Sequence, residues 1–478
     1  MSRPAPAARR SLALSVPVLV LLWALGAHAA APAAARATSA SATTGRGWAH
    51  PWGRDAIIYG VVPSLFGKQP FKDLTVRLPQ LKELGVDVIW LSPINQTIPG
   101  DFGYSVTDYF DLRSDYGTKD EFRTLVDRAH ALGMRVIMDF VPNHTAREHA
   151  FFQDALRRGK ASPYYDFYDW KAPGKPEHYF DWEHLPNLNF DNPRVDDMVI
   201  DALEYWVRDF DVDGYRLDVA WGVKERDALL WPRTRTALEQ VKPSVFLVAE
   251  ATAKDPYYFS NGFDSAYDWT LEPGHWAWEK VWEDRARIAP RLREALADAT
   301  PPPGGMVMRF LNNNDTGERF VTRHGPDITR AAVALLFTLP GLPLIYTGDE
   351  IGAAYLPYQE PPPLEWEKDP HRLRPYYARL IALRKRLAAL RSPRFSLVDT
   401  RPESALAYLR TRDDGGEPVL VVMNWNARPQ SVQVKPPAGF KGALRDELSG
   451  EPVPVKAGAD GLTLDVPAWG VRVLTPTK

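Results

Sequence analysis

Cysteine is absent from this chain of 478 residues. The protein is therefore neither a lipoprotein anchored through cysteine nor a fold held by disulfides, and its stability depends on packing. An excess of either charge is also lacking, because 58 Lys and Arg stand against 60 Asp and Glu, for a formal net charge of −2. This balance gives no reason to expect nucleic acid or an acidic membrane surface as a partner.

The apolar stretch near the N-terminus is too short for a membrane anchor. It covers residues 12–25, whereas a membrane span requires roughly 20 residues. Two arginines precede it, which leaves a twin-arginine export route open, and the small-residue pattern AHA follows at 27–29. This order is typical of a secretory signal peptide over residues 1–29. We expect cleavage near Ala29, secretion to the periplasm or the medium, no stable membrane anchor, and a disordered leader over residues 30–50.

Short apolar runs alternate with amphipathic stretches over most of the chain. The runs expected to form buried parallel strands are residues 56–62, 86–91, 135–140, 214–218, 245–249, 263–267, 306–311 and 342–346. Helical patterns lie between them, among them 119–132, which closes on a glycine, and an apolar stripe within 195–206. We therefore predict an α/β fold, a (β/α)8 TIM barrel built from residues 51–144 and 193–392.

Two segments depart from this alternation. Residues 145–192 are too long for a loop inside a domain and are rich in aromatic residues, so we expect an inserted subdomain after the third strand, leaning over the barrel mouth. Most of its aromatics should form its own small core, and some should line the cleft. Residues 393–478 show short alternating strands around DDGG at 413–416, a hairpin signal that predicts a C-terminal antiparallel β-sandwich domain.

Acidic residues end three of the predicted strands. Asp218, Glu250 and Asp315 fall at carboxyl ends of strands, where α/β barrels gather their active-site groups. Arg216 lies two residues before Asp218 and shares its face of the strand, so its guanidinium should lower the pKa of Asp218. Such a cluster suits cleavage of bonds between sugars, and the 16 Trp suit stacking on sugar rings. The plainer reading is that an Asp at a strand end only caps the next helix.

Six short segments, taken together, resemble the α-amylase family, glycoside hydrolase family 13. They are GYSVTDY at residues 103–109, DFVPNH at 139–144, GYRLD at 214–218, VAE at 248–250, FLNNND at 310–315 and GLPLIYTGDE at 341–350. Each is weak alone, but six in register are specific. The resemblance covers nearly the whole chain beyond the predicted leader.

This resemblance implies a retaining hydrolase of α-1,4-glucosidic bonds. Asp218 would be the nucleophile and Glu250 the acid and base, with the two carboxyl groups roughly 5–5.5 Å apart and Glu250 held protonated near neutral pH. Asp315 would be the third carboxylate of the family, which hydrogen-bonds to sugar hydroxyls. Tyr104 would stack on the sugar at the cleavage point, and His144 would hydrogen-bond to its hydroxymethyl group.

The chain departs from the family pattern in two segments. Asn314 stands where the family usually has His, and because Asn cannot become cationic we expect altered pH dependence or subsite geometry. Trp221 and Gly222 replace a family Lys-His pair whose His offers a backbone contact to calcium. Asn143 matches a position that often ligates calcium, although Asn after Pro is also a common turn residue. A calcium site that lacks a ligand binds weakly, so we expect no required cofactor, weak or absent calcium dependence, and Trp221 stacking at a leaving-side subsite.

Three functions follow from these patterns. The leading one is a secreted, monomeric, endo-acting α-amylase that converts starch and related glucans to malto-oligosaccharides. LPNLN at 185–189 is closer to cyclomaltodextrinases, neopullulanases and maltogenic amylases, which gives the alternative: a hydrolase of maltodextrins and cyclodextrins with transglycosylation. The barrel pattern begins too soon after the expected cleavage site for the N-terminal β domain usual in those enzymes. The third is a non-catalytic barrel that serves as a partner protein, against which the three retained acids argue.

Overall fold

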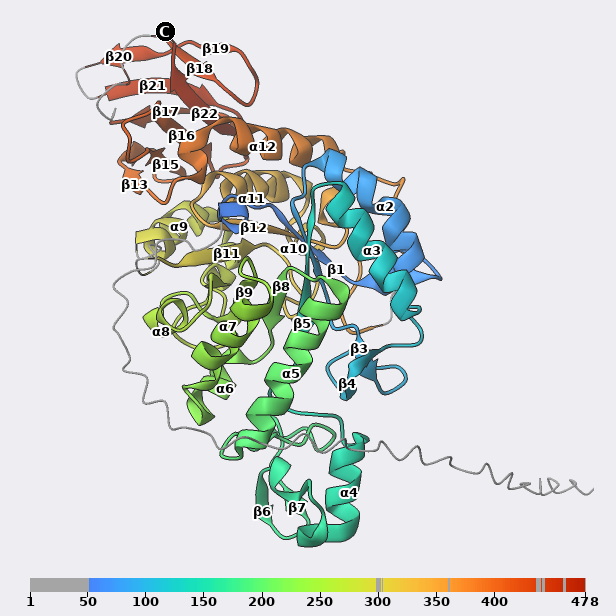
Figure 1. Ribbon diagram of the computed structural model, residues 1–478. Helices are drawn as coiled ribbons and strands as arrows, with labels where there is room; N and C mark the ends of the chain where they lie inside the picture. Colours follow the sequence, from blue (N-terminus) through green and yellow to red (C-terminus); the bar gives the residue numbers. More distant parts are fainter. Residues whose placement is uncertain are drawn as a thin grey trace, which may run out of the picture. The chain divides into compact units, whose positions relative to one another are not determined.

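The computed structural model describes residues 51–297, 302, 304–359, 362–435, 440, 443–458 and 461–477. The predicted signal peptide (1–29) and leader (30–50) lie outside these residues. Eight parallel strands form a closed barrel in the order β1-β12-β11-β10-β9-β8-β5-β2 (Figure 1). They are β1 (Ile58–Val61), β2 (Val88–Leu91), β5 (Arg135–Phe140), β8 (Gly214–Leu217), β9 (Phe246–Thr252), β10 (Ser265–Tyr267), β11 (Met306–Phe310) and β12 (Leu342–Tyr346). Each corresponds to one predicted run, so the predicted barrel is confirmed.

Side chains on the barrel strands alternate between the interior and the surrounding helices. On β9, Phe246 and Val248 belong to the interior cluster, whereas Leu247 and Ala249 pack outward. Successive residues of a strand point to opposite faces, so Glu250, two positions after Val248, falls on the inner face. A bulge interrupts the pairing of β9 with β10 beside Glu250, and bulges at such places re-aim side chains. The pleat of the strands thus directs particular side chains into one end of the barrel.

Gly214 is required by the close approach of β8 to β9. A Cβ atom built on it would lie 1.9 Å from the carbonyl oxygen of Phe246, far inside any contact distance. Gly214 pairs with Phe246 of β9 and with Ile137 of β5, and a side chain here would push β8 and β9 apart. The glycine therefore fixes the start of the strand that carries Arg216.

Helices surround the barrel, and the first of them packs on its interior cluster through the contact of Trp52 with Phe246. They are α1 (Pro51–Arg54), α2 (Pro70–Leu84), α3 (Lys119–Ala131), α5 (Pro193–Phe210), α6 (Ala220–Arg226), α7 (Leu230–Val241), α8 (Pro256–Ser260), α9 (Ile288–Ala297), α10 (Phe320–His324), α11 (Pro326–Thr338) and α12 (Arg374–Arg386). Short 3₁₀ helices are η1 (Pro63–Leu65), η4 (Glu279–Glu283), η5 (Arg285–Arg287), η6 (Asp349–Ile351) and η7 (Ala388–Arg391). A capping box between Thr118 and Glu121 begins α3, which explains why its start matches the prediction.

The segment between β5 and α5 forms its own small unit. It contains α4 (Ala150–Arg158), η2 (Gly159–Ala161), η3 (Tyr165–Phe167), β6 (Trp170–Ala172) and β7 (Lys175–Pro176) (Figure 1). Its aromatics pack on one another, with Phe151 stacked on Tyr164 at 3.8 Å and Tyr165 on Trp170 at 4.6 Å between ring centroids. A second hairpin, β3 (Asn95–Thr97) with β4 (Val106–Leu112), follows β2. We refer to residues 145–192 below as the insertion.

The last part of the chain forms two antiparallel sheets, as predicted. One contains β13 (Phe395–Val398), β15 (Ala405–Arg410), β16 (Val419–Asn424), β22 (Val471–Pro476), β18 (Leu444–Asp446) and β19 (Pro452–Val453); the other contains β14 (Thr400–Arg401), β17 (Gln430–Val434), β21 (Gly461–Val466) and β20 (Lys456–Gly458). Strands β15 and β16 pair as the expected hairpin. The Tyr408 hydroxyl hydrogen-bonds to Thr338 of α11 at 2.5 Å, which ties the first sheet to the barrel.

Within the part of the chain that the structure describes, none of the helices combines the length and the apolar character needed to span a membrane.

Candidate active site

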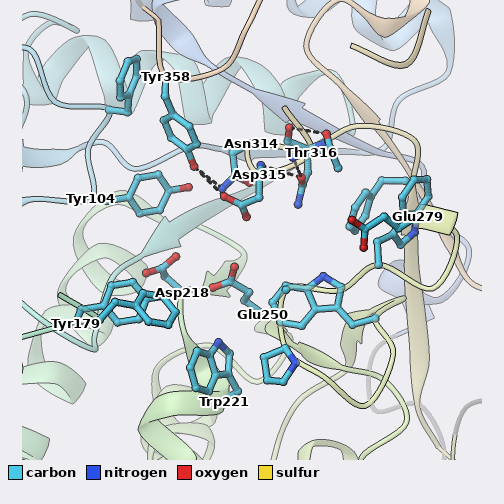
Figure 2. Close-up of a pocket in the computed structure, with 18 of the residues that line it drawn as sticks. Tyr104, Tyr179, Asp218, Trp221, Glu250, Glu279, Asn314, Asp315, Thr316 and Tyr358 are labelled. Atoms are coloured by element: carbon cyan, nitrogen blue, oxygen red, sulfur yellow. Dashed lines mark hydrogen bonds between the residues drawn. The ribbon is translucent and has the colours of Figure 1, made fainter. Parts of the chain in front are cut away.

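A cavity of about 500 Å³ lies at the carboxyl ends of the barrel strands, within the range of about 300–1,000 Å³ typical of ligand sites. Side chains from the loops after several strands and from the insertion line it, among them Tyr104, His144, Tyr179, Asp218, Trp221, Glu250, Trp276, Asn314, Asp315 and Tyr358. Figure 2 shows the carboxyl groups of Asp218, Glu250 and Asp315 facing the same space. The fold therefore brings the three predicted acids to one pocket.

One guanidinium connects the acids at the floor of this cavity. Nη1 of Arg216 lies 2.7 Å from Oδ1 of Asp218 and 2.9 Å from Oδ1 of Asp139. Nη2 lies 2.7 Å from Oε1 of Glu250, an ion-pair contact without the directional geometry of a hydrogen bond. Arg216 and Asp139 are fully buried, and Asp218 is 5% and Glu250 8% exposed. Asp218 and Glu250 are thus held at the two nitrogens of one planar group.

Glu250 has a second fixed contact. Its Oε2 accepts a hydrogen bond of 2.6 Å from the backbone N–H of Val219, the residue after Asp218. Val219 has φ of 47°, a left-handed conformation that is costly for a β-branched residue. The backbone of the β8–α6 turn is therefore shaped to direct this N–H toward Glu250, and Asp218 does not cap α6.

Burial raises the pKa values of these acids. The pKa of Asp218 is raised to about 7 by burial, with Arg216 opposing and Asp139 and Asp315 adding to the rise. Arg216 lowers this pKa, as expected, but the effect of burial is larger, so the expected net lowering is wrong. Burial also raises the pKa of Glu250 to about 8, in agreement with the expectation that it stays protonated near neutral pH. Asp218 is therefore the more acidic of the two.

Asp315 and Asn314 lie across the cavity and share one partner. The Tyr358 hydroxyl donates to Oδ1 of Asp315 at 3.0 Å and accepts from Nδ2 of Asn314 at 2.9 Å (Figure 2). Oδ1 of Asn314 is buried without a hydrogen-bond partner among the described residues, so it is open to a hydroxyl of a ligand. Asp315, in contrast to Asp218 and Glu250, is solvent-exposed.

Tyr104 and His144 also line the cavity, and the Tyr104 ring lies 6.2 Å from the Tyr358 ring. The Tyr104 hydroxyl donates to Oδ2 of Asp139 at 3.3 Å, and its ring is exposed to the cavity. Nε2 of His144 lies 3.1 Å from the carbonyl oxygen of Tyr104, and Nδ1 lies 3.1 Å from Nδ2 of Asn143. Both ring nitrogens of His144 are thus engaged, and burial lowers its pKa to about 3. The predicted hydrogen bond from His144 to a sugar hydroxymethyl group would have to share or replace the contact with Tyr104.

Aromatic residues line much of the cavity. Trp221 lines it beneath Glu250 in Figure 2, and the Phe180 ring of the insertion lies 6.4 Å from the Trp221 ring. Phe180 is 62% and Trp182 51% exposed, which is high for side chains of this kind. Trp276, before η4, lines it as well. Apolar ring faces beside a polar centre suit a chain of sugar units.

Sequence reasoning missed several residues of this site. Tyr358 lies in the loop between η6 and α12, where neither periodicity nor a motif marks it. Tyr267 accepts a hydrogen bond of 3.1 Å from Nε of Arg216, and its place at the end of a predicted strand could have indicated it. Asp139, noted in the sequence only as part of a family motif, accepts hydrogen bonds from Arg216 and from Tyr104 in the loop between β3 and β4.

The candidate calcium ligand, Asn143, is already engaged. Its Oδ1 accepts a hydrogen bond from the Arg226 guanidinium. Among the residues that the structure describes, no group of three or more His, Asp or Glu is arranged to hold a metal ion. The residues around Asn143 therefore do not fit a resident calcium ion.

Comparison with known proteins agrees with this geometry. Residues 67–367 match the family "Alpha amylase, catalytic domain", and residues 395–473 match "Maltogenic Amylase, C-terminal domain". The alpha-amylase MalA of Haloarcula japonica is 32% identical over 84% of this chain, which spans 59% of that relative's length. A cyclomaltodextrinase of Geobacillus thermopakistaniensis is 31% identical over 88% of this chain and 72% of its own. The crystal structure of an alpha-amylase from Geobacillus thermoleovorans with acarbose superimposes with a TM-score of 0.74 at 26% identity, covering 91% of this chain and 99% of that one.

Proposed function

Because the chain belongs to the alpha-amylase family of glycoside hydrolases, we propose that it cleaves α-1,4-glucosidic bonds of cyclodextrins and short malto-oligosaccharides with retention of configuration. The observation that carries this proposal is the pairing of Asp218 and Glu250 through Arg216 at the floor of one cavity. Two carboxyl groups bridged by a single guanidinium suit the separation of roughly 5–5.5 Å that retaining enzymes use.

In the first step a carboxylate oxygen of Asp218 attacks the anomeric carbon, and the glycosidic C–O bond breaks. Glu250, protonated near neutral pH, gives its proton to the leaving oxygen. In the second step Glu250 takes a proton from water, whose oxygen attacks the same carbon and releases Asp218. Arg216 favours the ionised form of Asp218 that begins and ends this cycle.

The remaining side chains of the cavity supply binding and orientation. Asp315, held by Tyr358, would accept hydrogen bonds from sugar hydroxyls, and the free Oδ1 of Asn314 could accept another. Tyr104 offers its ring to the sugar at the cleavage point, and Trp221 to the sugar on the leaving side. None of these roles requires a metal ion.

The substrate class rests on three supports. The C-terminal segment matches the domain of maltogenic amylases, one similar enzyme is a cyclomaltodextrinase, and LPNLN at 185–189 resembles those enzymes. The exposed rings of Phe180 and Trp182 beside the cavity offer apolar surface to a cyclic substrate. An endo-acting amylase on starch is the second candidate, favoured by the similarity to an alpha-amylase of Haloarcula japonica.

Initial rates on β-cyclodextrin and on soluble starch distinguish the two candidates. We expect kcat/KM to be higher on β-cyclodextrin than on soluble starch. A clearly higher value on starch would refute this proposal and favour the endo-acting amylase. The mechanism has its own test, because NMR of the first product should show the α-anomer. Asp218→Asn should abolish turnover, and full hydrolysis by this variant would refute the assigned nucleophile.

Export is the last part of the proposal and rests on residues 1–29 alone. Protein isolated from the culture medium should begin near residue 30 by N-terminal sequencing. Recovery of the whole chain in the cytosol, starting at Met1, would contradict it.

A further inference from the structure

Arg226, at the end of α6, joins three separate parts of the chain. Its Nη1 donates to the carbonyl oxygen of Leu188 at 2.7 Å and to Oδ2 of Asp169 at 3.4 Å, both in the insertion. Its Nη2 donates to Oδ1 of Asn143 and, at 3.4 Å, to the Asn143 carbonyl oxygen after β5. Its Nε donates to the carbonyl oxygen of Gly222 in α6 at 3.3 Å. A guanidinium has five N–H donors, and each of the five has an oxygen acceptor here.

The same oxygens cannot also form a calcium site. Calcium takes six to eight oxygen ligands, commonly with several carboxylates. Here Asp169 supplies the one carboxylate among the five acceptors, which matches the single charge of a guanidinium and would leave a divalent ion poorly neutralised. The side chain of Arg226 also passes over the ring of Phe190 at 4.8 Å, so its position is fixed by packing as well as by hydrogen bonds.

The contact between Arg226 and Asn143 extends toward the cavity. Because a guanidinium only donates hydrogen bonds, it requires the oxygen of the Asn143 amide on its side, and the amide nitrogen then faces His144. Nδ2 of Asn143 donates to Nδ1 of His144 at 3.1 Å, so the ring proton must lie on Nε2. Nε2 in turn donates to the Tyr104 carbonyl oxygen at 3.1 Å. The chain of contacts ends at a residue that lines the cleft.

We propose that Arg226 takes the role of a structural cation in this protein. Its hydrogen bonds connect the insertion to the barrel. Through Asn143 they also fix the tautomer of His144 and the position of Tyr104. Arg226 touches no reacting atom, so it is a positioning residue. This role is independent of which glucan the enzyme prefers.

The test compares the parent protein with Arg226→Met, which keeps the length of the side chain but none of its donors, and with Arg226→Lys. Hydrogen exchange over residues 165–190 should be faster in Arg226→Met, and kcat/KM on maltoheptaose should fall about 10-fold or more, as for other orienting partners. For Arg226→Lys, both the exchange rate and kcat/KM should lie between those of the parent and those of Arg226→Met. Arg194→Met is the matched control, because Arg194 also reaches the insertion, through the Pro163 carbonyl oxygen at 3.2 Å, but lies outside this chain of contacts. It should leave kcat/KM near the parent value.

Two further measurements separate the proposed role from a general loss of structure. In ¹⁵N-histidine spectra, His144 of the parent should show an unprotonated Nδ1, and Arg226→Met should lose this single tautomer. Titration of the chelator-treated parent with calcium should give no binding and no change in Tm or activity. If chelation removes activity and calcium restores it, or if Arg226→Met keeps the parent exchange rates and tautomer, the proposal is overturned. Should Arg226→Met fail to fold, Arg226→Lys and the calcium titration decide the question.

Discussion

Removing the charge of Arg216 should move the whole pH–rate profile toward alkaline pH. In Arg216→Met the guanidinium that contacts Asp139, Asp218 and Glu250 is lost, while the length of the side chain is kept. An arginine beside a carboxyl group lowers its pKa by about 1–3 units, so its loss should raise the pKa of Asp218 by that amount. The pKa of Glu250 should rise in the same direction.

The expected loss follows from the fraction of Asp218 that is ionised. With the pKa at about 7, half of Asp218 is ionised at pH 7. A rise of about 1 unit leaves about one molecule in eleven ionised, and a rise of about 3 units about one in a thousand. The variant should therefore lose about 5-fold to about 500-fold of kcat/KM at about pH 7, and recover part of this loss at about pH 9.

The assay is the initial rate of maltoheptaose hydrolysis across the pH range, for the parent and the variant. The kcat/KM of the variant divided by that of the parent should rise steadily with pH. A ratio that stays constant would show that Arg216 positions the acids without tuning their ionisation, and would refute this reasoning. Arg410→Met is a suitable control. Arg410 lies in β15 of the C-terminal domain and is as buried as Arg216, but it donates to backbone carbonyl oxygens, including that of Arg394 at 3.0 Å. Its profile should keep the parent shape.

Three other predictions follow from the site. Glu250→Gln should be inactive yet more stable than the parent, because the raised pKa makes ionisation of Glu250 costly as pH rises from about 4.5 to about 8. The gain in the free energy of unfolding should grow over this window to at most about 4–5 kcal/mol, and a gain independent of pH would contradict the argument. Tyr358→Phe should lower kcat/KM about 10-fold with little change in Tm, since it removes the hydrogen bonds to Asp315 and Asn314; unchanged kinetics would exclude an orienting role. Trp182→Ala should lower kcat/KM on β-cyclodextrin about 3-fold to about 10-fold more than on maltotriose, and equal losses would remove Trp182 from the proposed cyclic-substrate surface.

The sequence predicted the barrel and the two main acids for the same reason. Each barrel strand is a short apolar run, and its residues alternate between two faces by covalent geometry alone. A residue such as Asp218, two positions after Arg216, must therefore share its face wherever the strand ends up. The family motifs then supplied the chemistry that the spacing suggested, and the structure places Asp218, Glu250 and Asp315 in one cavity.

Other features depended on the folded arrangement. Nothing near Tyr358 in the sequence indicates Asp315, 43 residues earlier, as its partner, and nothing near Arg226 indicates Asn143, 83 residues earlier. The departure of Trp221 and Gly222 from the family pattern suggested weaker calcium binding, but it did not reveal that a guanidinium reaches the same oxygens. The direction of the Asp218 pKa was predicted wrongly, because the sequence showed the neighbouring arginine but not the depth of burial.

The sequence by itself thus determined which residues lie on each strand, which face they share and which chemistry they can perform. These properties depend on bonded neighbours, and a strand carries them into any fold. Only the tertiary structure decided which distant loops meet over the cavity, what covers each acid, and which cation joins the insertion to the barrel. Desolvation and long-range pairing depend on every segment that packs around a group, so they exist only once the chain has folded.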